Sequence, residues 1–264
     1  MDSAGRVGLV TGAGRGLGRA IALGLAEAGA DVAVNYRRDE EAALSVAEAV
    51  ERLGRRARIY RASVSDADEA QDLVKQVVSD FGFVDILVHN AGIASRGLPV
   101  AETDPAELLR VVGVHAFGPH YLSRAVLPVM RARPRGDIIM ISSIGTLHPT
   151  PNSAPYSMGK AAMEALAFTL AKEERQYGVR VNVVAPGLLD TDMGRRSARA
   201  ATGVADIHDL DERSGFGRVC RPEDVAGVVR FLVSDAGGYI TGTRIVVDGG
   251  TDPVLDAMLG RTLP

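Results

Sequence analysis

The amino-acid sequence predicts an α/β fold, in which one doubly wound domain spanning residues 1–264 holds a seven-stranded parallel sheet with helices on both faces. Short apolar runs alternate with helix-length segments whose apolar residues recur at spacings of three and four, which is the pattern of buried strands joined by amphipathic helices. The chain shows no internal repeat, low-complexity tract or linker, so we expect a single domain. The predicted strands are residues 7–10, 32–35, 58–60, 86–89, 138–141, 179–184 and 244–247.

Composition and charge exclude several classes of protein. The 264 residues are 46% hydrophobic and 24% charged, enough for a large core. A net charge of −3 gives no positive field for nucleic acid, and the single cysteine, Cys220, allows neither a disulfide framework nor a metal cluster. The N-terminus is unlike a secretory signal, and no apolar run reaches the roughly 18 residues of a membrane span. We therefore expect a cytoplasmic protein without a metal, nucleic-acid or membrane partner.

The connection after the first strand predicts a dinucleotide site. Residues 11–18 read TGAGRGLG and precede a helical run at 19–28. Glycines let the backbone turn tightly and approach a pyrophosphate, while a helix N-terminus supplies N–H donors and positive potential. An ordinary flexible turn is the alternative. The residues assigned to the cofactor are Gly12, Arg15, Gly16, Leu17 and Gly18.

The end of the second predicted strand indicates which dinucleotide is bound. An NAD site usually has an acid here for the ribose diol, whereas a phosphate on that ribose requires arginine. Asn35 stands in place of an acid, with Arg37 and Arg15 nearby, so the sequence predicts NADP(H). The alternative is that Arg37 and its neighbour Arg38 are ordinary solvated charges.

A serine, a tyrosine and a lysine form the candidate catalytic group. A strand-like run at 137–141 leads to Ser143, and a helix beginning near Pro155 carries Tyr156 and Lys160 on one face. Reduction of a carbonyl by hydride needs a proton donor. An ammonium about 5 Å from a phenol, at an effective dielectric of roughly 20, is worth about 3 kcal/mol, so Lys160 should lower the pKa of Tyr156 while Ser143 holds the substrate oxygen. A plain surface pair is the alternative.

These motifs, with several others, resemble the short-chain dehydrogenase/reductase family, and in detail its 3-oxoacyl-(acyl-carrier-protein) reductase members. The matching segments span residues 11–250 and are TGAGRGLG, HNAG (89–92), SS (142–143), YSMGK (156–160), VNVVAPG (181–187), TDM (191–193), RPEDVA (221–226) and ITG with VDGG. The resemblance implies a Rossmann domain and an NADP(H)-dependent oxidoreductase.

The resemblance also implies further cofactor contacts. One turn would lie against the cofactor after the fourth strand, a second would flank the adenine with a serine in place of the usual aspartate, and a third would line the nicotinamide. Tyr156 and Lys160 would also touch the cofactor. The residues of the three turns are Asn90, Ala91 and Gly92; Ser63 and Val64; and Pro186, Gly187, Leu189 and Thr191.

One position departs from the family pattern. His115 stands where the family has the asparagine that holds a proton-relay water. Imidazole both donates and accepts hydrogen bonds and titrates near neutrality, so His115 could replace that group; alternatively the relay is impaired.

The sequence leaves the substrate open. The resemblance places a substrate lid at about 193–217, and implies a homotetramer. Arg131, Arg133 and Arg135 form a basic cluster suited to an acyl carrier protein, but Tyr177 stands where a carrier-binding basic residue would be expected. We expect a hydride transfer on a 3-oxoacyl thioester. The alternatives are another ketone, sugar or steroid alcohol, or a dinucleotide-binding protein without catalysis.

Overall fold

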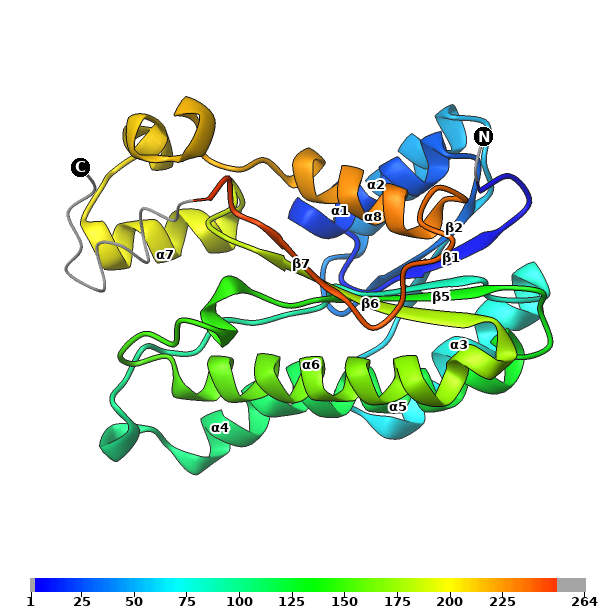
Figure 1. Ribbon diagram of the computed structural model, residues 1–264, viewed down its shortest axis with the longest axis horizontal. Coiled ribbons are helices and arrows are strands. Elements are labelled where there is room, and N and C mark those ends of the chain that lie inside the picture. Colours follow the sequence, from blue (N-terminus) through cyan, green and yellow to red (C-terminus); the bar gives the residue numbers. More distant parts are fainter. Residues whose placement is uncertain (1–2, 251–264) are drawn as a thin grey trace.

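The computed structural model describes residues 3–250 and contains the predicted seven-stranded parallel sheet (Figure 1). Every strand pair is parallel, and the strand order is β3-β2-β1-β4-β5-β6-β7. The strands are β1 (Val7–Val10), β2 (Asp31–Tyr36), β3 (Ala57–Arg61), β4 (Ile86–His89), β5 (Gly136–Ile141), β6 (Val179–Pro186) and β7 (Arg244–Val247). The predicted fold class is therefore confirmed.

Helices join successive strands and cover both faces of the sheet. The α-helices are α1 (Gly16–Glu27), α2 (Glu40–Arg52), α3 (Ala67–Phe81), α4 (Pro105–Val112), α5 (Gly118–Met130), α6 (Ala154–Glu174), α7 (Asp192–Thr202) and α8 (Pro222–Val233). The short 3₁₀ turns are Val100–Glu102, Ile144–Thr146, Arg175–Tyr177, Ile207–Arg213 and Gly215–Gly217, and one π-helical turn, Gly113–Phe117, joins α4 to α5. No helix within residues 3–250 is long and apolar enough to cross a membrane.

Two apolar cores lie on opposite faces of the sheet. In Figure 1, α1, α2 and α8 lie above the sheet, whereas α3, α5 and α6 lie below it. Leu25, Val46 and Val229 belong to the upper core, and Leu73, Leu122 and Met163 to the lower one. The inner strands β1, β4, β5 and β6 are buried along their whole length, and β1 and β4 accordingly read as nearly continuous apolar runs. The other two also bury polar side chains, namely Asp137 on β5 and Arg180 and Asn182 on β6.

The strand order creates a switch point between β1 and β4. From β1 the chain winds outward to β2 and β3, and then returns to β4 and winds the other way to β7. Ligands of open α/β sheets bind in the crevice that opens at the carboxyl ends of the strands at such a point. The glycine-rich loop after β1 and the turn after β4 lie on its two sides, so the topology brings these two motifs together.

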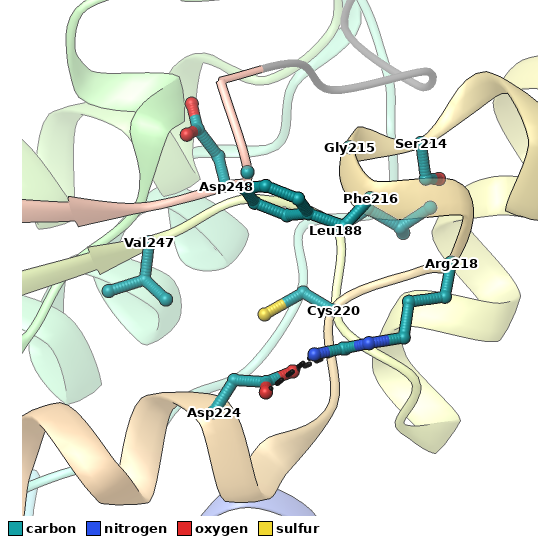
Figure 2. Close-up of a pocket in the computed structure, with 10 residues that line it drawn as sticks. Leu188, Ser214, Gly215, Phe216, Arg218, Cys220, Asp224, Val247 and Asp248 are labelled. Carbon is teal, nitrogen blue, oxygen red and sulfur yellow. Dashed lines mark hydrogen bonds and ion pairs between the residues drawn. The ribbon is translucent and has the colours of Figure 1, made fainter.

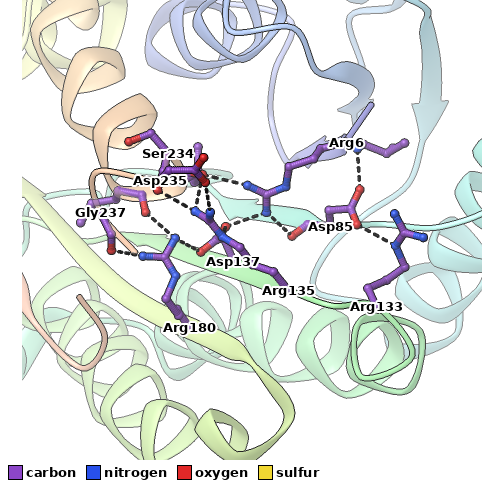
Figure 3. A network of polar contacts seen from close by, with 12 residues as sticks. Arg6, Asp85, Arg133, Arg135, Asp137, Arg180, Ser234, Asp235 and Gly237 are labelled. Atoms are coloured by element: carbon purple, nitrogen blue, oxygen red, sulfur yellow. Dashed lines mark hydrogen bonds and ion pairs between the residues drawn. The ribbon is translucent and has the colours of Figure 1, made fainter. Parts of the chain in front are cut away.

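A buried ionic network closes the opposite, amino-terminal edge of the sheet (Figure 3). Asp137 on β5 is 1% exposed and accepts from Arg6, Arg135 and Arg180 at 2.6, 3.0 and 2.6 Å. Asp85 accepts from the backbone N–H of Val7, at 2.9 Å. The network ties β1, β4, β5 and β6 together away from the cofactor edge.

The three arginines before β5, interpreted from the sequence as a basic cluster, are each paired with a buried acid. Arg133 bonds Asp85 at 2.9 Å, and Arg135 bonds Asp137. Arg131 makes a two-point contact of 2.8 and 2.6 Å with buried Glu174. All three guanidinium groups serve the fold, so they do not form an unpaired basic surface for an acidic carrier.

Candidate active site

Three sequence-predicted side chains meet at the carboxyl end of β5. Ser143 follows the strand directly and accepts a hydrogen bond from the backbone N–H of Gly145 at 3.1 Å. Tyr156 and Lys160 lie one turn apart on α6, with Nζ of Lys160 5.8 Å from the centroid of the Tyr156 ring. The same ammonium donates to the carbonyl oxygen of Ile141, 2.6 Å away, which anchors it to the end of the strand. A hydroxyl, a phenol and an amine therefore share one site.

Burial dominates the electrostatics of this site. The pKa of Tyr156 is raised above 10.0, chiefly by burial, while its hydrogen bond with Ser143 opposes the shift. The sequence argument expects Lys160 to lower this pKa, but the shift is upward, and the group that opposes it is Ser143 and not the lysine. Burial also lowers the pKa of Lys160 to about 7, against the attraction of Glu164. Near neutral pH the phenol carries its proton, while the amine lies at the midpoint of its titration.

His115 lies beside the phenol in the π-helical turn between α4 and α5. Its ring is fully buried and stands edge-on to Tyr156, with 5.1 Å between the ring centroids. Nε2 lies 2.8 Å from the carbonyl oxygen of Ile93 and 3.2 Å from the backbone nitrogen of the same residue, so it donates to the oxygen in one tautomer and accepts from the N–H in the other. Nδ1 is buried with no hydrogen-bond partner within residues 3–250. Burial, with the nearby charge of Lys160, lowers the pKa of His115 to about 3, so the imidazole is neutral.

The glycine-rich loop is held closely against the turn after β4. A Cβ on Gly18 would collide with the carbonyl oxygen of Gly12 and would lie 2.6 Å from Nδ2 of Asn90. The Asn90 amide donates to the carbonyl oxygens of Thr11 and Gly12 at 2.9 and 3.2 Å. Helix α1 begins at Gly16, inside the motif rather than after it, so its N-terminal N–H groups open onto the loop. The cradle fits a pyrophosphate bound at a helix N-terminus.

The interpretation of Asn35 is wrong. Its side chain is 1% exposed and turned into the fold, where Oδ1 accepts from the N–H of Gly12 at 3.3 Å and Nδ2 donates to the carbonyl oxygens of Tyr60 and Ala62, both at 3.2 Å. Asn35 therefore supports the glycine-rich loop and does not face a ribose.

The strand instead ends at Tyr36, and the side chains that follow define the ribose side of the site. Arg37 is exposed, and within the described residues no carboxylate pairs with it. Of the two nearby acids, Asp39 caps α2 by accepting from the N–H of Ala42, and the charge of exposed Glu40, in the first turn of α2, adds to burial in raising the pKa of the Tyr36 phenol. Within residues 36–40 both acids therefore lie at the start of α2 and not at the end of β2.

The remaining predicted contacts lie on turns at the same edge of the sheet. Val64 is buried in the lower core, and the backbone N–H of Ser63 donates to Glu69 at 2.7 Å. After β6, the N–H of Gly187 donates to the carbonyl oxygen of Val247 at 3.0 Å, and Thr191 caps α7. The structure places all nine of the further predicted cofactor residues on turns or strand ends at this edge: Ser63, Val64, Asn90, Ala91, Gly92, Pro186, Gly187, Leu189 and Thr191.

The loop and α7 approach each other across this edge. Nη1 of Arg15 lies 4.0 Å from a carboxylate oxygen of Asp192, and both side chains are more than half exposed. An ion pair this long and this exposed contributes little to stability. Arg15 can therefore turn from Asp192 to a phosphate at small cost.

The segment predicted as a lid consists of α7 and two 3₁₀ turns. Ala198, Ile207, Leu210 and Val219 form a small apolar core of its own. Figure 2 shows the pocket beside it, of about 170 Å³, and the thiol of Cys220 at its edge. Burial raises the pKa of that thiol to about 12, so it is not a nucleophile at neutral pH. The lining residues are Leu188, Ser214, Gly215, Phe216, Arg218, Cys220, Asp224, Val247, Asp248 and Gly249, and none belongs to the serine–tyrosine–lysine group.

The sequence argument missed the polar residues that support Ser143 from behind. Glu164 on α6 accepts from the hydroxyl of Ser142 at 2.5 Å and pairs with Arg244 at 3.2 Å. Arg244 comes from β7, about eighty residues away in the chain. The spacing of Lys160 and Glu164, four apart on one helix, is the one signal that could have indicated the acid.

The known proteins that this chain resembles are oxidoreductases that match it over most of its length. A family model described as enoyl-(acyl carrier protein) reductase matches residues 12–252. A 3-oxoacyl-[acyl-carrier-protein] reductase of a Synechocystis species is 37% identical over 93% of this chain and 96% of that protein. An L-rhamnose 1-dehydrogenase (NAD(P)(+)) of a Sphingomonas species is also 37% identical, over 93% and 96%.

A solved structure shows the same architecture. The short chain dehydrogenase of Burkholderia cenocepacia, crystallised in complex with NADP, superposes with a TM-score of 0.86 at 32% identity, over 95% of this chain and 99% of that one. Family model, relatives and structure all match nearly the full described length. The chain belongs to the short-chain dehydrogenase/reductase family of oxidoreductases.

Proposed function

We propose that this protein transfers a hydride between NADP(H) and a carbonyl or secondary alcohol, with a 3-oxoacyl thioester as the substrate. The observation that carries the proposal is the convergence of Ser143, Tyr156 and Lys160 at the strand end that faces the switch point. The bound nicotinamide supplies or accepts the hydride. The protein's own groups then have to bind the substrate oxygen and move one proton.

Each of the three side chains has one task in this proposal. Ser143 donates a hydrogen bond to the carbonyl oxygen of the substrate. Tyr156, whose raised pKa keeps it protonated near neutrality, gives its proton to the oxygen as negative charge develops there. The ammonium of Lys160 stabilises the phenolate that remains, because opposite charges attract strongly in a buried site.

His115 assists as a hydrogen-bond acceptor in this scheme. With a pKa of about 3, its protonated form is scarcely populated at neutral pH, so it does not carry the proton as an imidazolium. In the tautomer with the proton on Nε2, the unpartnered Nδ1 can accept a hydrogen bond from a water that replenishes the proton of Tyr156 by way of Lys160. We propose that His115 thereby takes the part of the asparagine expected at this position.

The choice of NADP(H) over NAD(H) rests on Arg37 and Arg15. Both are exposed, one follows β2 and the other lies in the glycine-rich loop, and Asp39 beside Arg37 is engaged as the cap of α2. A phosphate on the adenosine ribose would find two guanidinium groups there, and the long contact of Arg15 with Asp192 would compete only weakly. The B. cenocepacia structure was solved with NADP, whereas the L-rhamnose dehydrogenase is named for both cofactors.

A second substrate class is favoured by a separate observation. The arginines before β5 are paired within the fold, and Tyr177 is covered by Arg131, with 4.4 Å from the guanidinium carbon to the ring centroid. These groups leave little free basic surface for an acyl carrier protein, and one relative at 37% identity oxidises a sugar by its name. A sugar or other small alcohol is therefore the second candidate.

We further propose one domain with a lid at about residues 193–217 and a homotetramer as the working assembly. Exposed apolar side chains on and beside α4 support the assembly, and Leu109 and Phe117 are 65% and 46% exposed. Size determination in solution tests it. The chain after Gly250, whose crossing to a neighbour was considered from sequence, lies outside the described residues.

The deciding experiment compares the wild type with Tyr156→Phe. We expect the wild type to oxidise NADPH when acetoacetyl-CoA is added, and the variant to bind NADPH with similar affinity and lose at least about a hundredfold in kcat. Turnover with L-rhamnose or simple ketones but not with the thioester would select the second substrate class. A Tyr156→Phe protein with full reductase activity would refute the catalytic assignment.

A further inference from the structure

Four polar side chains form a closed cluster behind Ser143, which we name the Glu164 cluster. Oε1 of Glu164 lies 2.5 Å from the hydroxyl of Ser142, 2.8 Å from that of Thr146 and 3.2 Å from Nε of Arg244. The side chains of Glu164 and Arg244 are only 11% and 12% exposed. An acid and a base buried this deeply need one another, because either alone would be an uncompensated charge.

The Glu164 cluster holds the backbone of Ser143 from both sides. Ser142 precedes the candidate catalytic serine, and Thr146 follows it in the adjoining 3₁₀ turn. Nη2 of Arg244 donates to the carbonyl oxygen of Ser143 at 3.0 Å, and the Thr146 hydroxyl lies 2.9 Å from the same oxygen. Three elements, β5, α6 and β7, are thereby linked through the residue that would bind the substrate.

The same acid acts on the candidate catalytic lysine. Tyr156, Lys160 and Glu164 follow one another at intervals of four on α6, so they share one helix face. The negative charge of Glu164 raises the pKa of Lys160 and opposes the stronger effect of burial. Glu164 therefore favours the ammonium form of Lys160.

We propose that Glu164 and Arg244 are positioning residues of the reaction: Arg244 fixes the backbone of Ser143, and Glu164 both anchors Arg244 and keeps Lys160 charged. This inference rests on the proposed roles of Ser143, Tyr156 and Lys160. Neither residue of the pair contacts the substrate in this scheme.

The other titratable groups around Lys160 do not compete for this role. His115, from the turn between α4 and α5, and His89, from β4, both have a pKa lowered to about 3 by burial, so they are neutral at working pH. Tyr156 on α6 has a raised pKa and is neutral as well. Among residues 3–250, Arg244 on β7 is the cation that pairs with Glu164, at 3.2 Å.

Removing the charge of Glu164 and removing the charge of Arg244 should shift the pH profile of kcat in opposite directions. Glu164→Gln removes the negative charge and leaves Arg244 unpaired, so the pKa of Lys160 falls and the alkaline limb of the reductase profile moves to lower pH. Arg244→Met leaves Glu164 unpaired, so the pKa rises and the same limb moves to higher pH. We expect about one pH unit in each case and a kcat about 10- to 100-fold below the wild type, because Ser143 is no longer held.

Controls separate this role from a general loss of structure. Glu173→Gln changes an exposed acid on the same helix and should leave the profile unchanged. NADPH affinity should stay within about threefold of the wild type in the variants of the pair, since neither residue belongs to the cofactor cradle. Arg244→Lys keeps the positive charge that Arg244→Met removes. In this variant the alkaline limb of the kcat profile should lie at the wild-type pH, while kcat itself stays below the wild-type value.

The outcomes distinguish the inference from the proposed function. Wild-type protein without turnover on any carbonyl would overturn the proposed function, and the inference with it. Active wild type with unshifted profiles, or with both variants shifted the same way, would overturn the inference alone. If a single variant fails to fold, Glu164→Gln/Arg244→Met, which leaves neither charge alone, carries the test: lost kcat with intact NADPH binding supports the proposal, and wild-type kcat refutes it.

Discussion

Replacing Lys160 with methionine should stabilise the protein while it removes the reaction. Lys160 is 3% exposed, and burial lowers its pKa from 10.5 to about 7. Below pH 7 the amine is charged in both the folded and the unfolded chain, so folding bears the full cost of burying the ammonium. Between 7 and 10.5 the unfolded chain binds the proton more often than the folded one, so wild-type stability rises with pH in this window.

The size of the effect follows from the same two pKa values. Each pKa unit corresponds to about 1.4 kcal/mol, so the displacement is worth about 5 kcal/mol in total. Methionine is similar in length and has no charge, and Glu164 keeps Arg244 as its partner in the variant. The free-energy advantage of Lys160→Met over the wild type should therefore shrink by about 4 kcal/mol between pH 6 and pH 10.

Urea unfolding of both proteins across this pH range gives the measurement. Other titrating groups change both proteins alike and cancel in the difference. Lys172→Met, an exposed position on the same helix, serves as the control and should differ from the wild type by the same small amount at every pH. If the difference between Lys160→Met and the wild type does not change with pH, the burial argument for Lys160 is wrong.

Three further predictions concern the cofactor site and the ionic network. Gly18→Ala places a Cβ against the glycine-rich loop and should weaken NADPH binding at least about tenfold by fluorescence titration, whereas Gly227→Ala, with open space around it on α8, should leave binding unchanged; equal affinities would contradict the close packing. Arg37→Asp should lower the affinity for NADPH about 10- to 100-fold and spare NADH, and a parallel loss for both cofactors would count against phosphate recognition. Asp137→Asn removes the shared carboxylate of Arg6, Arg135 and Arg180, of which Arg135 keeps Asp235, and should cost about 3–5 kcal/mol in urea unfolding, so a change below 1 kcal/mol would show that the network is dispensable.

The parts of the fold that follow from local patterns could be predicted from the sequence. Strands of a parallel sheet are short and mostly apolar runs, and the sequence predicts the strands at 7–10, 86–89 and 244–247 with the bounds that the structure has, although the last is an edge strand that is only partly buried. The strand predicted at 138–141 begins two residues earlier in the structure, at Gly136. Gly136 has no side chain and Asp137 is charged, so neither adds to an apolar run, yet both pair with β6. Local hydropathy cannot register such a pairing.

The candidate site shows where sequence patterns stop. Spacing along one helix placed Tyr156 and Lys160 together, but the pKa values depend on burial, which a pattern of residues does not contain. Asn35 was misplaced because strand alternation did not reveal that its amide turns inward to the glycine-rich loop. Arg244 lies far along the chain from Ser143, and only the pairing of β7 with β6 brings them together.

The role of His115 also depended on three dimensions. The sequence indicated a substitution at a relay position, but not the π-helical turn that carries it or the unpartnered Nδ1. A π turn inserts an extra residue in the helix and is frequent at functional sites. The structure thereby identifies Nδ1 as the ring nitrogen left for a relay, because both hydrogen-bond contacts of the imidazole within residues 3–250 are made by Nε2.

The most direct measurement is the oxidation of NADPH by the purified protein after acetoacetyl-CoA is added, run side by side with Tyr156→Phe. The account predicts thioester-dependent turnover by the wild type, and NADPH binding without turnover by the variant. NADPH oxidation of equal rate in both proteins would contradict the account, because the proton would then come from a group other than Tyr156.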